Sequence, residues 1–145
     1  MKRISAFALM LAAAVRAAAP DISEFMAANM ATLSDEDGDA SDWIEIHNPG
    51  AELLSLEGWH LTDDPEELDK WSFPAATLPA GGYLVVFASG KNRRDPAGEL
   101  HTSFRLNAAG DYLALVAPDG SAIAREFAPA FPEQKTDFSF GIGTR

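Results

Sequence analysis

The sequence predicts an all-β protein, either an antiparallel sandwich or a barrel, and two observations support this prediction. After residue 20, no segment keeps the helical period of 3.6 residues. Instead, short alternating apolar segments recur about every 10–15 residues, and turns rich in Pro, Gly, Asn and Asp separate them. A chain of 145 residues, 47% of them apolar, can fill one hydrophobic core but is too short for two ordinary domains.

Residues 1–19 have the composition of a secretory signal peptide. A basic start precedes an apolar run over residues 4–15, and small residues close the segment. The run has about 12 residues, whereas a helix that spans a bilayer needs roughly 20. We therefore expect a secreted or cell-envelope protein that is not transmembrane once the signal is removed, with a folded domain over residues 21–142. An amphipathic helix at the start of the domain is the alternative.

The expected strands are recognised by alternation and by the turns between them. In residues 42–48, Ile44 and Ile46 point to one face and the residues between them to the other. Residues 83–88 are apolar on both faces, which favours a central strand. Pro-Asp-Gly-Ser at 118–121 lies between two apolar runs and predicts a hairpin. The segments with strand pattern are 21–27 (expected at a sheet edge), 42–48, 58–63, 70–74, 83–88, 102–106, 112–116, 122–127 and 138–142.

Four segments in this order resemble a lamin-tail domain, above all the type found in exported bacterial proteins. They are DWIEIHNPG at 42–50, LEGWHLTDD at 56–64, LPAGGYLVVF at 78–87 and LNAAGDYLAL at 106–115. The resemblance runs from about residue 22 to residue 142. It implies an immunoglobulin-like antiparallel β-sandwich that serves as a non-catalytic binding or tethering module, commonly as one part of a larger exported protein.

The acidic segment before the second strand is a candidate calcium site. Asp35, Asp37 and Asp39 alternate like the first ligands of an EF-hand loop, and Asp42 could add a further oxygen. A formal EF-hand is excluded, because glycine stands at loop position 4 and Ile46 takes the place of the glutamate at position 12. A looser calcium site remains, since a divalent cation relieves the repulsion between close carboxylates. The alternative is a solvated acidic loop.

Two weaker metal hypotheses involve other side chains. His47 and His60 lie on strands that we expect to be neighbours, so they could hold zinc together with a carboxylate, although no H-x-x-x-H spacing supports this. A second acidic segment, residues 63–67, follows a strand expected beside the first and could share a cation with it. Surface histidines and separate polar loops are the alternatives.

The remaining polar and aromatic residues suggest binding more than catalysis. The chain has no cysteine, which excludes thiol chemistry, and no Gly-x-Ser-x-Gly elbow. A net charge of −11 argues against nucleic-acid binding. Two groups remain: three tryptophans that could stack on a sugar, with two of them expected in the core, and a basic group that could contact phosphate or an acidic partner. These are Trp43, Trp59 and Trp71, and Lys91, Arg93 and Arg94.

These observations lead to one expected function and two alternatives. We expect a non-catalytic interaction or tethering module whose partner is a protein or a cell-envelope component. The first alternative is the N-terminal accessory fragment of a larger secreted enzyme or kinase-like protein. The second is a calcium-dependent carbohydrate-binding module.

Overall fold

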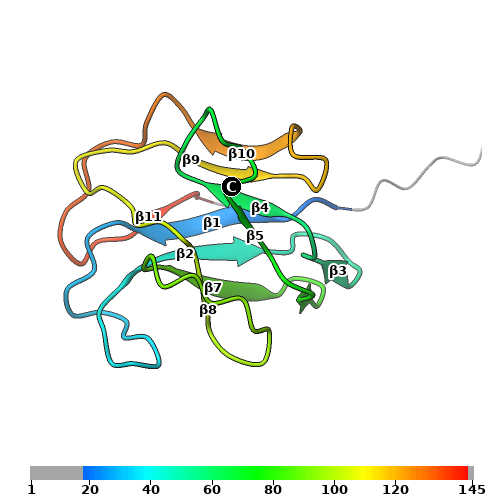
Figure 1. Ribbon diagram of the computed structural model, residues 1–145, viewed down its shortest axis with the longest axis horizontal. Coiled ribbons are helices and arrows are strands. Elements are labelled where there is room, and N and C mark those ends of the chain that lie inside the picture. The colour runs from blue at the N-terminus through cyan, green and yellow to red at the C-terminus, as the bar shows by residue number, and fades with distance from the viewer. Residues whose placement is uncertain (1–17, 144–145) are drawn as a thin grey trace, which may run out of the picture.

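The computed structural model describes residues 18–143, and these residues form a β-sandwich (Figure 1). The strands are β1 (Asp21–Met26), β2 (Asp42–His47), β3 (Leu54–Ser55), β4 (His60–Thr62), β5 (Trp71–Ser72), β6 (Thr77–Leu78), β7 (Tyr83–Ala88), β8 (Leu100–His101), β9 (Leu113–Val116), β10 (Ile123–Phe127) and β11 (Phe140–Gly141). One sheet has the order β11-β1-β2-β7-β8 and the other β10-β9-β4-β5, while β3 and β6 form a separate ribbon. The predicted signal peptide, residues 1–19, lies almost entirely outside the described residues.

The main core lies between the two sheets. Ile44 and Ile46 are fully buried, as the alternation in β2 predicts, and Leu113 and Leu115 of β9 belong to the same cluster. Phe25 of β1 is also fully buried and lies among three further aromatic rings, those of Phe127, Phe131 and Phe140, at centroid distances of 5.1, 4.7 and 5.3 Å. Burial of this continuous apolar surface is the main stabilising contribution in a chain without disulfides.

A second, smaller cluster lies on the outer face of the five-stranded sheet. Met26, Trp43 and Phe87 form it, and each is nearly buried although it points away from the main core. Thr32 contacts the sulfur of Met26, and His101 stacks on the ring of Phe87 at 5.3 Å. The chain around the acidic segment therefore covers this part of the outer face, which an exposed sheet would leave to solvent.

Two of the strand predictions are wrong. Segment 21–27 was expected at an edge, but β1 lies between β11 and β2, because residues 140–141 return and pair with it. Segment 102–106 alternates between buried and exposed side chains but makes only an isolated bridge, from Arg105 to Ser89. Within it, the Thr102 hydroxyl donates to the Phe104 carbonyl, a local bond that competes with strand pairing. The strand forms just before it, as β8, which runs parallel to β7.

Other predictions are confirmed. The strand β7 is central, between β2 and β8, and the Pro-Asp-Gly-Ser turn joins β9 to the antiparallel β10. In that turn, an oxygen of Asp119 accepts hydrogen bonds from the N–H groups of Ser121 and Ala122, and Gly120 has a positive φ of 74°. Within residues 18–143, no helix is long and apolar enough to cross a membrane.

Candidate functional site

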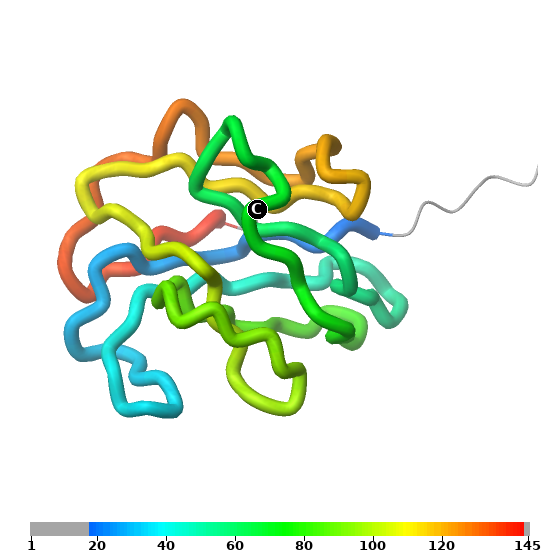
Figure 2. Tube along the Cα trace, viewed as in Figure 1, coloured from blue at the N-terminus to red at the C-terminus, as the bar shows by residue number. Residues whose placement is uncertain are grey.

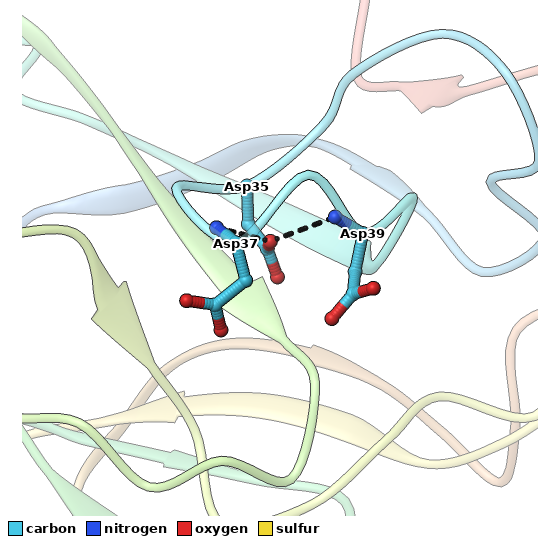
Figure 3. Close-up of side chains that lie close together, drawn as sticks. All are labelled: Asp35, Asp37 and Asp39. Atoms are coloured by element: carbon cyan, nitrogen blue, oxygen red, sulfur yellow. Dashed lines mark hydrogen bonds between the residues drawn. The ribbon is translucent and has the colours of Figure 1, made fainter.

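The acidic segment folds around the side chain of Asp35. One oxygen of this carboxylate accepts hydrogen bonds from the backbone N–H groups of Asp37 and Asp39, both at 3.0 Å, and Gly38 closes the turn with a φ of 83° (Figure 3). The other oxygen accepts a bond from the Ser41 hydroxyl. The turn directs the carboxylates of Asp35, Asp37 and Asp39 to one side, and one oxygen of each lies within 4.8 Å of the others.

The ammonium group of Lys91 lies among these three carboxylates. Its Nζ is 2.6 Å from Asp35, 2.7 Å from Asp37 and 2.8 Å from Asp39. The lysine belongs to the segment after β7, which lies beside the acidic segment at the lower edge of Figure 2. We call Asp35, Asp37, Asp39 and Lys91 the aspartate–lysine cluster. It joins two segments that are more than 50 residues apart in the chain.

Arg93 extends this contact with two further ion pairs. Its guanidinium group lies 2.7 Å from Glu36 and 2.8 Å from Asp37. Arg94, by contrast, donates from Nε to the carbonyl of Ser72 in β5. The basic group that the sequence suggested for an external partner is thus largely occupied inside the protein. The sequence identifies both charged segments but not their pairing, for which their opposite charge is the available signal.

Three members of the cluster, Asp35, Asp37 and Lys91, are ionised at neutral pH. Burial alone would raise the pKa of Asp35, but hydrogen bonds from Lys91, the backbone and Ser41 together hold it well below its usual value. Desolvation likewise opposes the charge on Lys91, yet the bonds to Asp35, Asp37 and Asp39 raise its pKa well above the usual value. Arg93, and then Lys91, lower the pKa of Asp37. These groups compensate one another as fixed charges and do not exchange protons near pH 7.

The geometry bears on the predicted calcium ligands. Three of them, Asp35, Asp37 and Asp39, come together, but Lys91 lies where a metal ion would bind, so it would have to move away before calcium could enter. Asp42 does not join this group, since one of its oxygens accepts a bond from the Asn29 N–H at 3.2 Å. Calcium binding by this loop therefore stays a prediction.

Asn29, which is only 4% exposed, organises the start of the same loop. Its side-chain amide donates to the carbonyls of Leu33 and Ser41, and its oxygen accepts from the hydroxyl and N–H of Thr32. These bonds connect the two ends of the acidic segment. The sequence contains a plain signal for a loop here but none that singles out this asparagine.

A buried serine–histidine pair lies next to the cluster. Ser89 Oγ is 2.8 Å from His101 Nδ1 and also accepts a bond from the Lys91 N–H. His101 is fully buried, and burial lowers its pKa, so it is neutral at pH 7. Its Nε2 lies 3.8 Å from Glu36, beyond hydrogen-bond distance. With the serine buried and no carboxylate bonded to the imidazole within the described residues, the pair supports the loop and does not form a catalytic triad.

The two weaker metal hypotheses do not hold. The strands of His47 and His60 were expected to be neighbours, but β2 and β4 belong to different sheets, so a joint zinc site is excluded. His47 instead stacks on Tyr83 at 4.3 Å, and His60 contacts the Ser72 hydroxyl at 2.8 Å. The same separation of β2 and β4 removes the reason for a cation shared with segment 63–67.

The three tryptophans do not form a sugar-binding row. Trp71 is 2% exposed in the core between the sheets, whereas Trp43 is covered on the outer face of the other sheet. Trp59 is partly buried and packs against the main core. Two of the three, Trp71 and Trp43, are buried as predicted, but of these two only Trp71 belongs to the main core.

The fold and the loop cluster together define an immunoglobulin-like β-sandwich whose conspicuous charges are paired with one another. Residues 16–127 match the model of the family described as Lamin Tail Domain, and this is most of the chain. The chain therefore belongs to this family, and the resemblance and the immunoglobulin-like antiparallel fold are confirmed. No curated protein and no solved structure gave a match. Strand β11 lies beyond the matched residues.

Proposed function

We propose that this domain is a non-catalytic interaction or tethering module of an exported or cell-envelope protein. The observation that carries the proposal is the Lamin Tail Domain match, because domains of this family commonly serve as interaction modules and are not enzymes. The pairing of charges within the protein is consistent with a non-catalytic role. Lys91 and Arg93 bind carboxylates within the protein, and among residues 18–143 the serine–histidine pair is buried.

The exported location rests on the composition of the N-terminal segment. Residues 1–19 combine a basic start with a short apolar run, and a cysteine-free domain folds equally well in an oxidising compartment. We propose a protein or a cell-envelope component as the partner. Tyr83, which is 58% exposed and stacked on His47, offers a rigid aromatic surface of the kind enriched at protein interfaces.

A sedimentation experiment tests the tethering function. Labelled protein is mixed with isolated cell envelopes of the source cells, and bound protein is measured after centrifugation. Saturable binding that excess unlabelled protein displaces is the expected result. An unrelated immunoglobulin-like domain of similar net charge serves as the control. Recovery of this protein only in the supernatant, at the level of the control, would contradict the proposal.

The alternatives predict different results in related experiments. An accessory fragment of a secreted enzyme or kinase-like protein would leave the envelopes unbound and would bind, or act on, the substrate of its catalytic neighbour. A calcium-dependent carbohydrate-binding module is favoured only by the convergence of Asp35, Asp37 and Asp39. It requires that calcium displace Lys91, so millimolar calcium should raise the Tm and produce heat in a titration. Absence of both effects would remove this candidate.

A further inference from the structure

A cavity of about 470 Å³ opens at the end of the five-stranded sheet. It lies where β2 begins and β7 ends, since Asp42 and Ala88 are register partners there. Its volume falls within the range of small-molecule pockets, roughly 300–1,000 Å³. Its lining is mainly polar and includes Asp39, Ser41, Asp42, Ser89, Lys91 and Arg105.

Of the four charged side chains that line this cavity, Asp39 and Lys91 pair with each other, whereas Asp42 and Arg105 have no ion-pair partner within residues 18–143. Lys91 is bound by three carboxylates. One oxygen of Asp42 accepts a bond from Asn29, whereas its Oδ2 accepts none from residues 18–143. Arg105 donates from Nε to the Ser89 carbonyl at 2.9 Å, and its terminal nitrogens contact no carboxylate of the described chain.

The two uncompensated groups are of opposite charge and face the same cavity without touching. Within the described residues, Asp42 and Arg105 form no ion pair, although the charge of Arg105 favours the ionised form of Asp42. Partial burial outweighs that effect and raises the pKa of Asp42 above its ordinary value. A ligand that carried both charges would satisfy both side chains at once.

We propose that this cavity binds a small zwitterion of the free amino-acid class, with its ammonium group at Asp42 and its carboxylate at Arg105. A guanidinium group binds a carboxylate through two parallel hydrogen bonds, and a carboxylate binds an ammonium group through charge-assisted bonds. Asp39 and Ser41 provide further oxygens on the same wall for the remaining ammonium protons. The inference goes beyond tethering, which does not depend on it.

Bonds within the protein hold the wall of this cavity together. Lys91 holds the acidic segment to the segment after β7, and Asn29 connects the two ends of the acidic segment. Asp42 is therefore held in place on one side by the Asn29 N–H and on the other by its strand pairing with Ala88. Little ordering of the protein accompanies binding, which favours affinity for a small ligand.

Isothermal titration of the intact protein with the common L- and D-amino acids tests the inference. We expect saturable binding of at least one amino acid in the millimolar range or tighter. Methylammonium alone, acetate alone and glucose should bind at least about tenfold more weakly, because each lacks one or both charged groups. Absence of saturable binding for every amino acid would overturn the inference, as would equal binding of methylammonium or acetate.

Four variants locate the binding site. Asp42→Asn and Arg105→Gln should each weaken binding about tenfold or more, since each removes a charge-assisted contact. Asp69→Asn changes an exposed aspartate elsewhere, and Arg94→Gln changes an arginine whose Nε also donates to a backbone carbonyl. Both controls should bind like the native protein, and circular dichroism melting verifies that all four fold. Unchanged affinity in Asp42→Asn or Arg105→Gln would contradict the assignment. If the native protein binds envelopes but binds no amino acid, this inference alone fails and the tethering function stands.

Discussion

Two acidic segments, residues 34–42 and residues 63–67, look alike in the sequence but are organised differently in the structure. In the first, the buried group is a carboxylate: Asp35 is 5% exposed, and Lys91 compensates its charge at 2.6 Å. At the second, the buried group is the neutral hydroxyl of Thr62, the residue just before the segment. Thr62 Oγ1 lies 3.0 and 2.7 Å from the carbonyl oxygens of Asp64 and Glu67.

The difference shows what converts a run of acidic residues into an ordered cluster. A buried carboxylate is stable only with a counter-charge and several hydrogen bonds, and a distant part of the chain has to supply them. The segment after β7 supplies Lys91 and Arg93 to the first acidic segment. Among the described residues, the second segment makes one ion pair, from Asp63 to the nearby Lys70. A neutral hydroxyl, which needs no counter-charge, organises its backbone.

The largest expected effect in this comparison is that of Asp35→Ala. It should lower the free energy of unfolding by about 3 kcal/mol, because Lys91 and two backbone N–H groups lose their acceptor. Asp64→Ala, which removes one exposed acceptor in the second segment, should cost less than about 1 kcal/mol. Urea unfolding measures both. Similar losses for the two variants would show that the segments are organised in the same way.

Lys91→Met should have the next largest effect and sharpens the calcium hypothesis. Loss of the ammonium group leaves three close carboxylates without their counter-charge, so stability at low salt should fall by about 1 kcal/mol. Millimolar calcium should then raise the Tm of the variant by at least about 3 °C more than that of the native protein. Thermal melting with and without calcium measures this difference. An equal response of both proteins would mean that Lys91 does not occupy the cation position.

The buried histidine next to the first segment predicts a pH dependence of stability. Burial lowers the pKa of His101 below its ordinary value of 6.5, so the unfolded chain takes up the proton more readily than the folded one. The stability that His101 contributes is present above pH 6.5 and is lost as the pH falls towards its lower folded pKa. The slope in this window cannot exceed about 1.4 kcal/mol per pH unit for one proton.

Unfolding free energies between pH 7.5 and pH 5 measure this slope. His101→Gln should flatten it, whereas His60→Gln, a change of a partly buried histidine in the other sheet, should leave it in place. The contribution of Asp35 falls in a separate window below its ordinary pKa of 3.8, because its own pKa is lowered. If the unfolding free energy of His101→Gln still fell with pH in this range, the pH dependence would come from another group.

The smallest expected effect concerns the exposed ion pairs, which should be alike in the two segments. Arg93→Gln and Lys70→Gln each remove a partly exposed cation, and we expect the Tm to fall by only about 1–2 °C in either case. Solvent screening explains the small size, so 1 M salt should abolish the difference from the native protein. A markedly larger fall in Tm for Arg93→Gln alone would show that Arg93 also belongs to the aspartate–lysine cluster.

Short-range patterns in the sequence were sufficient to predict most of the fold. Alternation placed Ile44 and Ile46 in the core, and the Pro-Asp-Gly-Ser turn predicted the hairpin, because side-chain direction and turn geometry depend on neighbouring residues. The same rules failed at β1 and at residues 102–106. Whether a strand is central or unpaired depends on a partner from another part of the chain, which a local pattern does not contain.

The candidate site was predicted less well, and for a related reason. The spacing of Asp35, Asp37 and Asp39 correctly indicated that their carboxylates converge. It did not show that Lys91 lies among them, nor that Asp42 turns to a cavity shared with Arg105. Residues separated by more than 50 positions interact here, and only the packing of the sheets brings them together.

By itself, the sequence determined the Lamin Tail Domain family, the all-β class and the acidic character of the loop at residues 34–42. These follow from composition, periodicity and turn chemistry, which act over a few residues. Only the tertiary structure decided that the acidic loop is neutralised in part by Lys91 and Arg93, and that Asp42 and Arg105 face one cavity. Coulomb attraction is decided by distance in space, and the folding of the two sheets sets that distance.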